Sequence, residues 1–196
     1  MVTVGVLAMQ GDFAAHRRAL GRVGATTVAV RAPADVAGLD ALVLPGGEST
    51  AMLHGIARDG LEEPLRAFLR SGRPVLGTCA GAILLARRVT DCPQRSFAAL
   101  DIDVERNAYG TQLDSFQAPL DAAAPLAGIR GTFIRAPRIR RVGRDVEVLA
   151  SHGGDPVLVR TGAVWAATFH PELDDDDRLL VLWLGGAQPE RATAAR

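Results

Sequence analysis

The sequence predicts an α/β fold, in which a mainly parallel β-sheet is flanked by helices and carries a small antiparallel extension. Two observations lead to this class. Over the first half of the chain, short apolar runs rich in β-branched residues alternate with helical patterns, which is typical of a parallel sheet. From residue 101 onward, short strand-like segments are separated by turn residues with little helix between them, which favours antiparallel pairing.

The elements are expected in a regular order. The continuous apolar run 2–9 predicts a strand buried on both faces. After it, we expect helices at 13–23, 61–71 and 80–88 and strands at 26–30, 41–44 and 74–77. The second half predicts strands at 101–106, 131–134, 147–151, 156–160 and 164–169. A last helix is expected over 174–183, with four aspartates at the positive end of its dipole. Residues 1–186 should form a single domain, and the polar segment 187–196 a disordered tail.

The composition of the chain indicates which kind of ligand it binds and in which compartment it is expected. The 196 residues carry 22 basic and 22 acidic side chains, so no overall field attracts nucleic acid or an anionic membrane surface, and a small neutral ligand is favoured. No apolar stretch approaches the roughly 20 residues that cross a bilayer. With two cysteines and no basic leader before the first strand, the sequence predicts a cytoplasmic protein without a disulfide framework.

The candidate nucleophile is Cys79. It stands between two glycines in the segment GTCAG at 77–81, directly after an expected strand and at the start of an expected helix. This is the pattern of a nucleophile elbow with sulfur in place of oxygen, where glycines permit a tight turn and the helix N-terminus favours the thiolate. A lone cysteine is more often a small buried hydrophobe, and Cys92, which has no glycine frame, is interpreted in that way.

A thiolate needs a base, and the candidates are His16, His54, His152 and His170. His170 is favoured because it follows the strand-like run 164–169, at the strand end where α/β sites assemble. Glu172 lies two residues on; in extended chain both side chains would share one side, so Glu172 can orient the imidazole as the third member of a triad. A metal site built from His170, Glu172 and residues 174–177 is the alternative. Helix capping explains those aspartates more simply, and no metal is expected.

A second glycine turn, LPGGEST at 44–50, ends another expected strand. Such a turn can aim the N–H of Gly47 at a developing oxyanion, together with the N–H of Ala80. An ordinary strand-to-helix turn with Ser49 as N-cap explains the same residues about as well. Neither GxGxxG nor GxxxxGK[ST] is present, so a phosphate loop is disfavoured and no cofactor is expected.

Taken in chain order, the glycine turn, Cys79 and the segment HPE at 170–172 resemble the class I (triad) glutamine amidotransferases. Flanking segments narrow this resemblance to the glutaminase subunits of pyridoxal 5'-phosphate synthases, over residues 2–184. These segments are GVLAMQGD at 5–12, PGGEST at 45–50, GTCAG at 77–81, RNAYG at 106–110, FIRAP at 133–137 and TFHPEL at 168–173. Together they are highly specific, whereas any one of them is not.

The resemblance implies a flavodoxin-like fold and hydrolysis of L-glutamine to L-glutamate and ammonia. It also implies a (β/α)8-barrel synthase partner that consumes the ammonia within a large hetero-oligomer. The residues that it assigns to the glutamine site are Gly47, Glu48, Ser49, Arg106, Ile134 and Arg135. A guanidinium suits a ligand carboxylate because it can bind bidentately, whereas an arginine without a ligand is a solvated surface charge.

The chain departs from the family pattern at Thr111, where an arginine is usual, and over residues 87–99, which match weakly. Neither departure touches the triad. Two other functions stay open. One is a glutaminase subunit that serves purine or histidine synthesis, which only the flanking segments oppose. The other is a non-catalytic flavodoxin-like module that binds a ligand at the strand ends, which the joint presence of thiol, base and carboxylate argues against.

Overall fold

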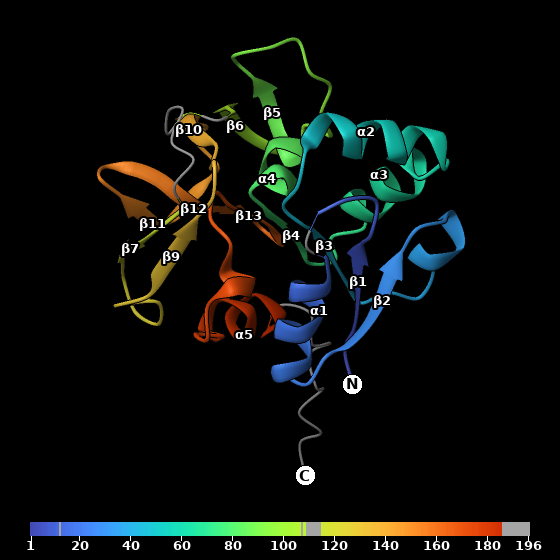
Figure 1. Ribbon diagram of the computed structural model, residues 1–196, viewed down its shortest axis with the longest axis horizontal. Coiled ribbons are helices and arrows are strands. Elements are labelled where there is room, and N and C mark those ends of the chain that lie inside the picture. The colour runs from blue at the N-terminus through green and yellow to red at the C-terminus, as the bar shows by residue number, and fades with distance from the viewer. Residues whose placement is uncertain (12, 107, 109–114, 186–196) are drawn as a thin grey trace.

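The computed structural model describes residues 1–11, 13–106, 108 and 115–185, and within them eight strands form one central sheet (Figure 1). Its parallel strands lie in the order β2 (Thr26–Val30), β1 (Thr3–Leu7), β3 (Ala41–Leu44), β4 (Val75–Thr78) and β13 (Val164–Ala167). The sheet continues antiparallel through β12 (Asp155–Thr161), β11 (Glu147–His152) and β8 (Asp121–Ala122). The predicted α/β class with an antiparallel extension is confirmed.

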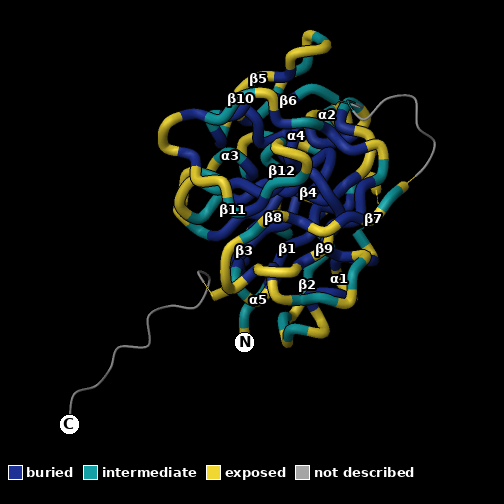
Figure 2. The backbone as a smooth tube through the Cα atoms, turned by 90° about the vertical axis from the view of Figure 1, so that its left-hand side faces the viewer, coloured by how far each residue is buried: buried dark blue, intermediate teal, exposed yellow. Residues whose placement is uncertain are grey.

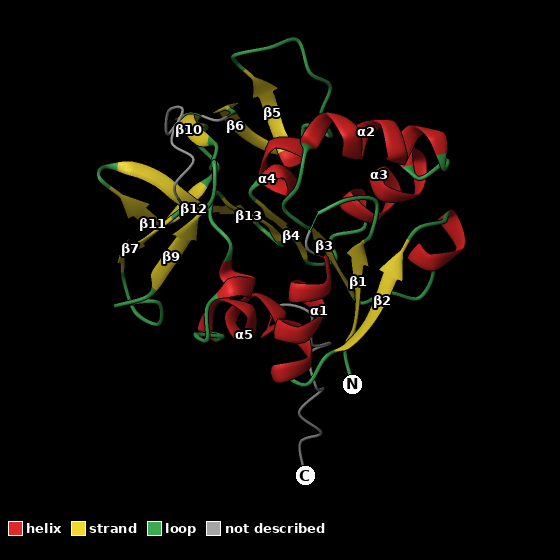
Figure 3. Cartoon of the chain, viewed as in Figure 1, coloured by secondary structure: helices red, strands yellow, loops and turns green. Residues whose placement is uncertain are grey.

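Helices cover both faces of this sheet (Figure 3). On one face, α2 (Ser49–Arg58), α3 (Glu62–Arg70) and α4 (Ala80–Leu85) share an apolar core with Leu42 of β3. On the other face, α1 (Phe13–Arg22) and α5 (Arg178–Gly185) share a core with the next residue of that strand, Val43. Successive side chains of a strand point to opposite faces, so a strand covered on both sides requires a continuous apolar run.

Two smaller sheets lie beside the central one. β5 (Ala86–Val89), β6 (Leu100–Glu105) and β10 (Arg138–Val142) form the first, and β7 (Phe116–Pro119) pairs with β9 (Arg130–Phe133) in the second. Two 3-10 segments, η1 (Pro33–Val36) and η2 (Pro171–Leu173), complete the elements of the described residues. The strands β5, β7, β8 and β10 were not expected from the sequence. Those of the first sheet depend on distant ion pairs, such as Arg141 of β10 with Asp103 of β6 at 3.2 Å, which local patterns do not reveal.

The helix expected at 80–88 is shorter than predicted. It ends at Leu85, and residues 86–89 form β5 instead. Ala86 and Val89 are buried while the two arginines between them are exposed, and this spacing of three residues also fits a helix, which is why the sequence pattern misleads here. The segment instead pairs with β6, with an irregular register between Ala86 and Arg88, and Arg87 reaches Asp101 on β6 at 3.0 Å.

The last helix begins at Arg178, four residues later than expected. Asp176 caps this helix, because its Oδ1 accepts the N–H of Arg178 at 3.2 Å. Two other aspartates of the run have partners elsewhere: Asp174 accepts a hydrogen bond from the hydroxyl of Thr132 at 2.9 Å, and Asp177 pairs with Arg22 of α1 at 2.7 Å. The predicted capping is therefore confirmed for Asp176, whereas the expected helix start at residue 174 was wrong.

Helix α2 was also absent from the expected elements, and its N-cap differs from the alternative considered for the glycine turn. The cap is Glu48 rather than Ser49, and its carboxylate accepts the N–H groups of Thr50 at 3.1 Å and Ala51 at 2.7 Å. The remaining predicted elements lie within two residues of their expected bounds.

Burial follows the layers closely, with the central strands buried and the connecting turns exposed (Figure 2). In the part of the chain that the structure describes, no helix is long and apolar enough to span a membrane. The predicted tail at 187–196 and the departure at Thr111 lie outside the described residues.

Candidate active site

Cys79 occupies the turn between β4 and α4 in a backbone conformation that non-glycine residues rarely adopt, with φ 47° and ψ −104°. Its N–H donates to the carbonyl of Ala167 at the end of β13 at 2.9 Å, which ties the turn to the neighbouring strand. The residue is 8% exposed, and its Sγ lies 3.9 Å from the carbonyl oxygen of Ile134. The thiol thus sits in the strained turn that the glycine frame predicts.

Close packing requires both glycines of that frame. A Cβ atom on Gly77 would lie 2.6 Å from the backbone carbonyl of Gly81. A Cβ atom on Gly81 would overlap with the carbonyl oxygen of Leu44 on β3. Backbone atoms of a central strand cannot move aside cheaply, so α4 approaches β3 and β4 this closely only with glycine at both positions.

His170 and Glu172 lie just beyond the end of β13. The N–H of His170 donates to the carbonyl of Thr132 on β9 at 2.8 Å, and the imidazole interacts with the side chain of Cys79, which raises the pKa of His170. Nδ1 of the ring lies 2.7 Å from Oε1 of Glu172. The two side chains meet through the 3-10 turn η2, which begins at Pro171, rather than through the extended chain assumed from the sequence. A thiol, an imidazole and a carboxylate therefore stand in a row.

The pKa values of His170 and Glu172 are strongly displaced. Burial alone would lower the pKa of His170, but hydrogen bonds and charge interactions with Cys79 and Glu172 outweigh it and raise that pKa to about 10. Burial alone would raise the pKa of Glu172, but the charges and hydrogen bonds of His16 and His170 lower it to about 2. The favoured state near neutral pH is an imidazolium of His170 paired with the carboxylate of Glu172.

The glycine turn at the end of β3 packs directly on this row. A Cβ atom on Gly46 would lie 2.5 Å from Cε1 of His170 and 3.5 Å from Cβ of Cys79. Gly47 has φ 149°, and a Cβ atom there would lie 3.2 Å from Cα of Gly11. Glycine is therefore needed in the turn, since any side chain at residue 46 would displace the imidazole.

A cavity of about 300 Å³ opens over Cys79 and His170, a size suited to a small molecule. Its lining contains all the residues that the resemblance assigns to a glutamine site, namely Gly47, Glu48, Ser49, Arg106, Ile134 and Arg135. Gly11, Gly46 and Ile83 complete the lining. Glu172 does not line the cavity, since it lies behind His170, and Ala80 is buried at the first residue of α4.

The polar wall of this cavity is held by a residue that no sequence pattern singles out. Gln94, in the weakly matching segment 87–99, accepts hydrogen bonds at Oε1 from Nη1 of Arg106 at 2.8 Å and from Oγ of Ser49 at 3.0 Å. Arg106 also donates to the hydroxyl of Thr50 at 3.2 Å. The segment thus joins β6 to the start of α2, a contact for which the sequence offers no local signal.

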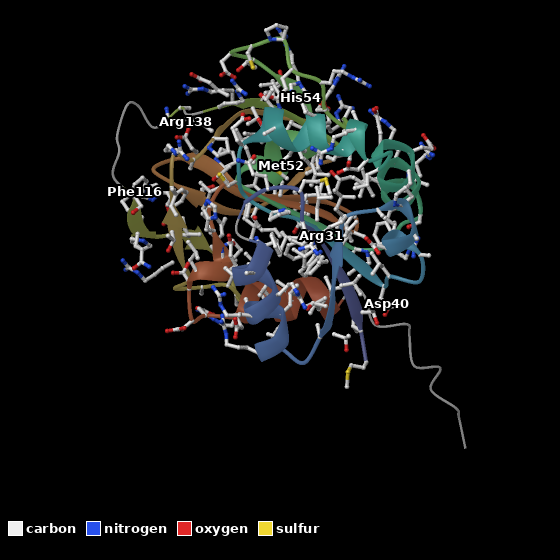
Figure 4. All side chains as sticks on the ribbon, turned by 45° about the vertical axis from the view of Figure 1, so that its right-hand side comes forward. Arg31, Asp40, Met52, His54, Phe116 and Arg138 are labelled. Carbon is white, nitrogen blue, oxygen red and sulfur yellow. The ribbon has the colours of Figure 1, made fainter. Side chains whose placement is uncertain are left out.

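The other histidines proposed as bases occupy different places. His54 is exposed on α2 (Figure 4), and His152 on β11 lies beside the ring of Phe133, with centroids 5.5 Å apart. His16 is fully buried on α1, with Nε2 3.3 Å from Oε2 of Glu172. Within the described residues, no three His, Cys, Asp or Glu side chains are placed to hold a metal ion. Cys79 and Cys92 are both free thiols.

Comparison with known proteins agrees with this fold. The model of the SNO glutamine amidotransferase family matches residues 6–184. The pyridoxal 5'-phosphate synthase subunit PdxT of Deinococcus radiodurans is 50% identical over 189 residues, which cover 94% of this chain and 96% of that relative. PdxT of Thermotoga neapolitana is 48% identical over 179 residues, covering 90% of this chain and 94% of the relative.

Solved structures give the same picture. One described as a glutamine amidotransferase matches with a TM-score of 0.89 and 46% identity, covering 94% of this chain and 98% of that chain. A putative GMP synthase component from Thermoplasma acidophilum matches with a TM-score of 0.70 over 95% of this chain and 94% of that chain, but at 19% identity it shares the fold alone. The class of protein is thus a glutamine amidotransferase. Within that class, the chain belongs to the SNO glutamine amidotransferase family.

Replacing Cys79 by alanine is expected to lower the pKa of His170 from its value of about 10, because the imidazolium loses the sulfur that stabilises it. An opposite charge at this range typically shifts a pKa by about one to three units. NMR titration of the labelled ring measures the shift, with Cys92→Ala as the matched control. An unchanged titration of His170 in Cys79→Ala would show that the thiol and the imidazole are not coupled.

Proposed function

We propose that this chain hydrolyses the side-chain amide of L-glutamine to L-glutamate and ammonia, and passes the ammonia to a synthase subunit for pyridoxal 5'-phosphate formation. The observation that carries the proposal is the row of Cys79, His170 and Glu172 at one cavity in a chain about half identical to PdxT subunits. A buried thiol, imidazole and carboxylate in that order form a nucleophile, its base and the group that orients the base.

In the first half of the proposed reaction, the thiolate of Cys79 attacks the side-chain carbonyl carbon of glutamine. The C=O electron pair moves to oxygen, and backbone N–H groups of Gly47 and Ala80 stabilise the oxyanion. The imidazolium of His170 then gives its proton to the departing nitrogen, and the C–N bond breaks to release ammonia and a thioester. The raised pKa of His170 suits this step, because the proton is already on the ring when attack begins.

In the second half, the now neutral His170 takes a proton from water, and the hydroxide adds to the thioester carbonyl. Collapse of this intermediate breaks the C–S bond, releases L-glutamate and restores the thiolate and imidazolium pair. Glu172 stays ionised throughout, since its pKa is held at about 2. Its role is to hold Nδ1 of His170 and to stabilise the positive charge on the ring.

The cavity lining fits a zwitterionic amino acid. Arg106, held in place by Gln94 and Thr50, and Arg135 supply guanidinium groups for the α-carboxylate. Glu48 supplies a negative charge for the α-ammonium group, and its pKa is lowered because the N–H groups of α2 and Arg106 outweigh the effect of burial. Ser49 and Ile134 complete the proposed glutamine site.

Ammonia needs an acceptor, so we place the chain in a large hetero-oligomer with a (β/α)8-barrel synthase subunit. The relatives' names support a synthase complex, and the segment 10–16, which follows β1, is the proposed docking region. Its exposed part includes Gln10 and Gly11, whereas Ala15 and His16 are buried. The balanced charge of the chain disfavours nucleic acid as a partner. Two free thiols suit a reducing compartment, so we place the reaction in the cytoplasm.

Replacing Cys79 by alanine should reduce glutamine hydrolysis by at least about a thousandfold, because no thioester can form without the sulfur. The fold should survive, since the turn accepts a small side chain. Glutamate release is measured enzymatically and folding by thermal melting, with Cys92→Ala as the control that keeps nearly full activity. A Cys79→Ala protein that keeps glutaminase activity within about tenfold of wild type would show that another group is the nucleophile.

Adding a barrel synthase subunit should raise glutamate production at saturating glutamine by at least about tenfold. The physical reason is the turn at Gly46 and Gly47, which can rotate one peptide at little steric cost and so complete the oxyanion hole only on docking. Losing one such donor typically costs about a hundred- to a thousandfold in turnover. Equal rates with and without the synthase subunit would contradict this control by the partner.

A further inference from the structure

His16 is a buried histidine that the proposed reaction does not use. It lies on α1, on the opposite face of the sheet from α4, and its side chain is 0% exposed. Its Nε2 lies 2.9 Å from Oγ1 of Thr78, the residue directly before Cys79, and 3.3 Å from Oε2 of Glu172. The ring therefore contacts two of the segments that carry the catalytic row.

The carboxylate of Glu172 faces two imidazoles, one at each oxygen. Oε1 is 2.7 Å from Nδ1 of His170, whereas Oε2 makes no hydrogen bond within the described part of the chain and has Nε2 of His16 as its ion-pair neighbour at 3.3 Å. Glu172 is only 4% exposed, so water does not compensate a carboxylate oxygen at this depth. Nε2 of His16 is thus the polar group that faces the second oxygen of the carboxylate.

The position of the proton on His16 follows from its neighbours. Both polar groups near the ring lie at Nε2, while Nδ1 is buried without a hydrogen-bond partner among the described residues. A proton on Nδ1 alone would leave a buried N–H unpaired and turn a lone pair toward a carboxylate. Nε2 therefore carries the proton and directs it toward Thr78 and Glu172.

This contact has a mechanical consequence for the triad. A carboxylate held at one oxygen only can rotate about its Cγ–Cδ bond, which would lengthen the bond from Oε1 to His170. With His16 at the second oxygen, rotation breaks a polar contact that nothing else in the buried part of the described site replaces. Asp174 also faces Glu172, but its charge has the same sign and opposes the carboxylate.

We propose that His16 is a positioning residue of this site, which holds Oε2 of Glu172 so that Oε1 stays aligned with His170. The inference rests on the proposed triad and extends it to a buried chain of Cys79, His170, Glu172 and His16. His16 touches neither glutamine nor the reacting atoms, since it does not line the cavity, and it acts only through Glu172.

A double-mutant cycle on His16 and Glu172 tests the proposal, with glutaminase activity measured in the presence of the synthase subunit. His16→Leu fills the site without an N–H, and should lower kcat about ten- to a hundredfold with KM within about threefold. His16→Gln, whose amide can donate from near the position of Nε2, should recover most of that loss. Glu172→Gln alone is expected to lower kcat by roughly two to four powers of ten.

The decisive result is the cycle itself. In the Glu172→Gln background, His16→Leu should cost less than about threefold, because the group through which His16 acts is already neutral. A loss of the same size in both backgrounds, or no loss in either, would overturn the proposal. His54→Leu makes the same change at an exposed histidine and should leave the rate unchanged. If His16→Leu does not fold, His16→Asn is used in its place, because its side chain is too short to reach Oε2. The same changes in kcat are then expected in the two backgrounds.

The rate at which iodoacetamide alkylates Cys79 supplies a second readout that needs no glutamine turnover. His16→Leu should slow alkylation in the wild-type background and leave it unchanged in Glu172→Gln. The two readouts distinguish failure of the proposed function from failure of the proposed role of His16. Wild-type protein without glutaminase activity would refute the proposed function, whereas the alkylation rates would still decide the role of His16. Equal slowing in both backgrounds would overturn the positioning role and leave His16 with a structural role only.

Discussion

The buried ion pair between His170 and Glu172 is the interaction on which the rest of the site depends. Two charged groups this far from water cost more to bury than they return in attraction, so such a pair contributes little to stability by itself. Its effect is chemical, because the carboxylate keeps a proton on an imidazole that burial would otherwise neutralise. The imidazolium of His170 can then persist beside Cys79 before glutamine binds.

The fold positions this pair by bringing three strand ends to one edge of the sheet. β3 ends in the glycine turn, β4 ends at Cys79, and β13 leads to His170. Adjacent parallel strands fix these ends side by side, and glycines at residues 46, 77 and 81 allow the backbone segments to pack without a Cβ between them. The helices on both faces exclude water from the strands, which makes the polar contacts of the site stronger than they would be in solvent.

Local patterns were sufficient for the parallel half of the sheet and for the row of thiol, imidazole and carboxylate, because each carries its signal within a few neighbouring residues. The glycine frame of Cys79 is one example, and the segment from His170 to Glu172 is another. Two contacts could not be predicted, because each joins segments that no local sequence pattern relates. They are the hydrogen bond from Arg106 to Gln94 and the contact of His16 with Glu172. The late start of α5 has the same cause, since Thr132 and Arg22 engage the aspartates before it.

The central claim is that Cys79 forms a covalent bond with the side-chain carbon of glutamine. Its most direct test is labelling with a glutamine analogue that carries a diazoketone in place of the amide, followed by digestion and peptide mass spectrometry. The account predicts one equivalent of adduct, located on Cys79 and suppressed by excess L-glutamine, with Cys92 unlabelled in the same sample. An adduct on Cys92, or labelling of Cys79 that glutamine does not suppress, would contradict it.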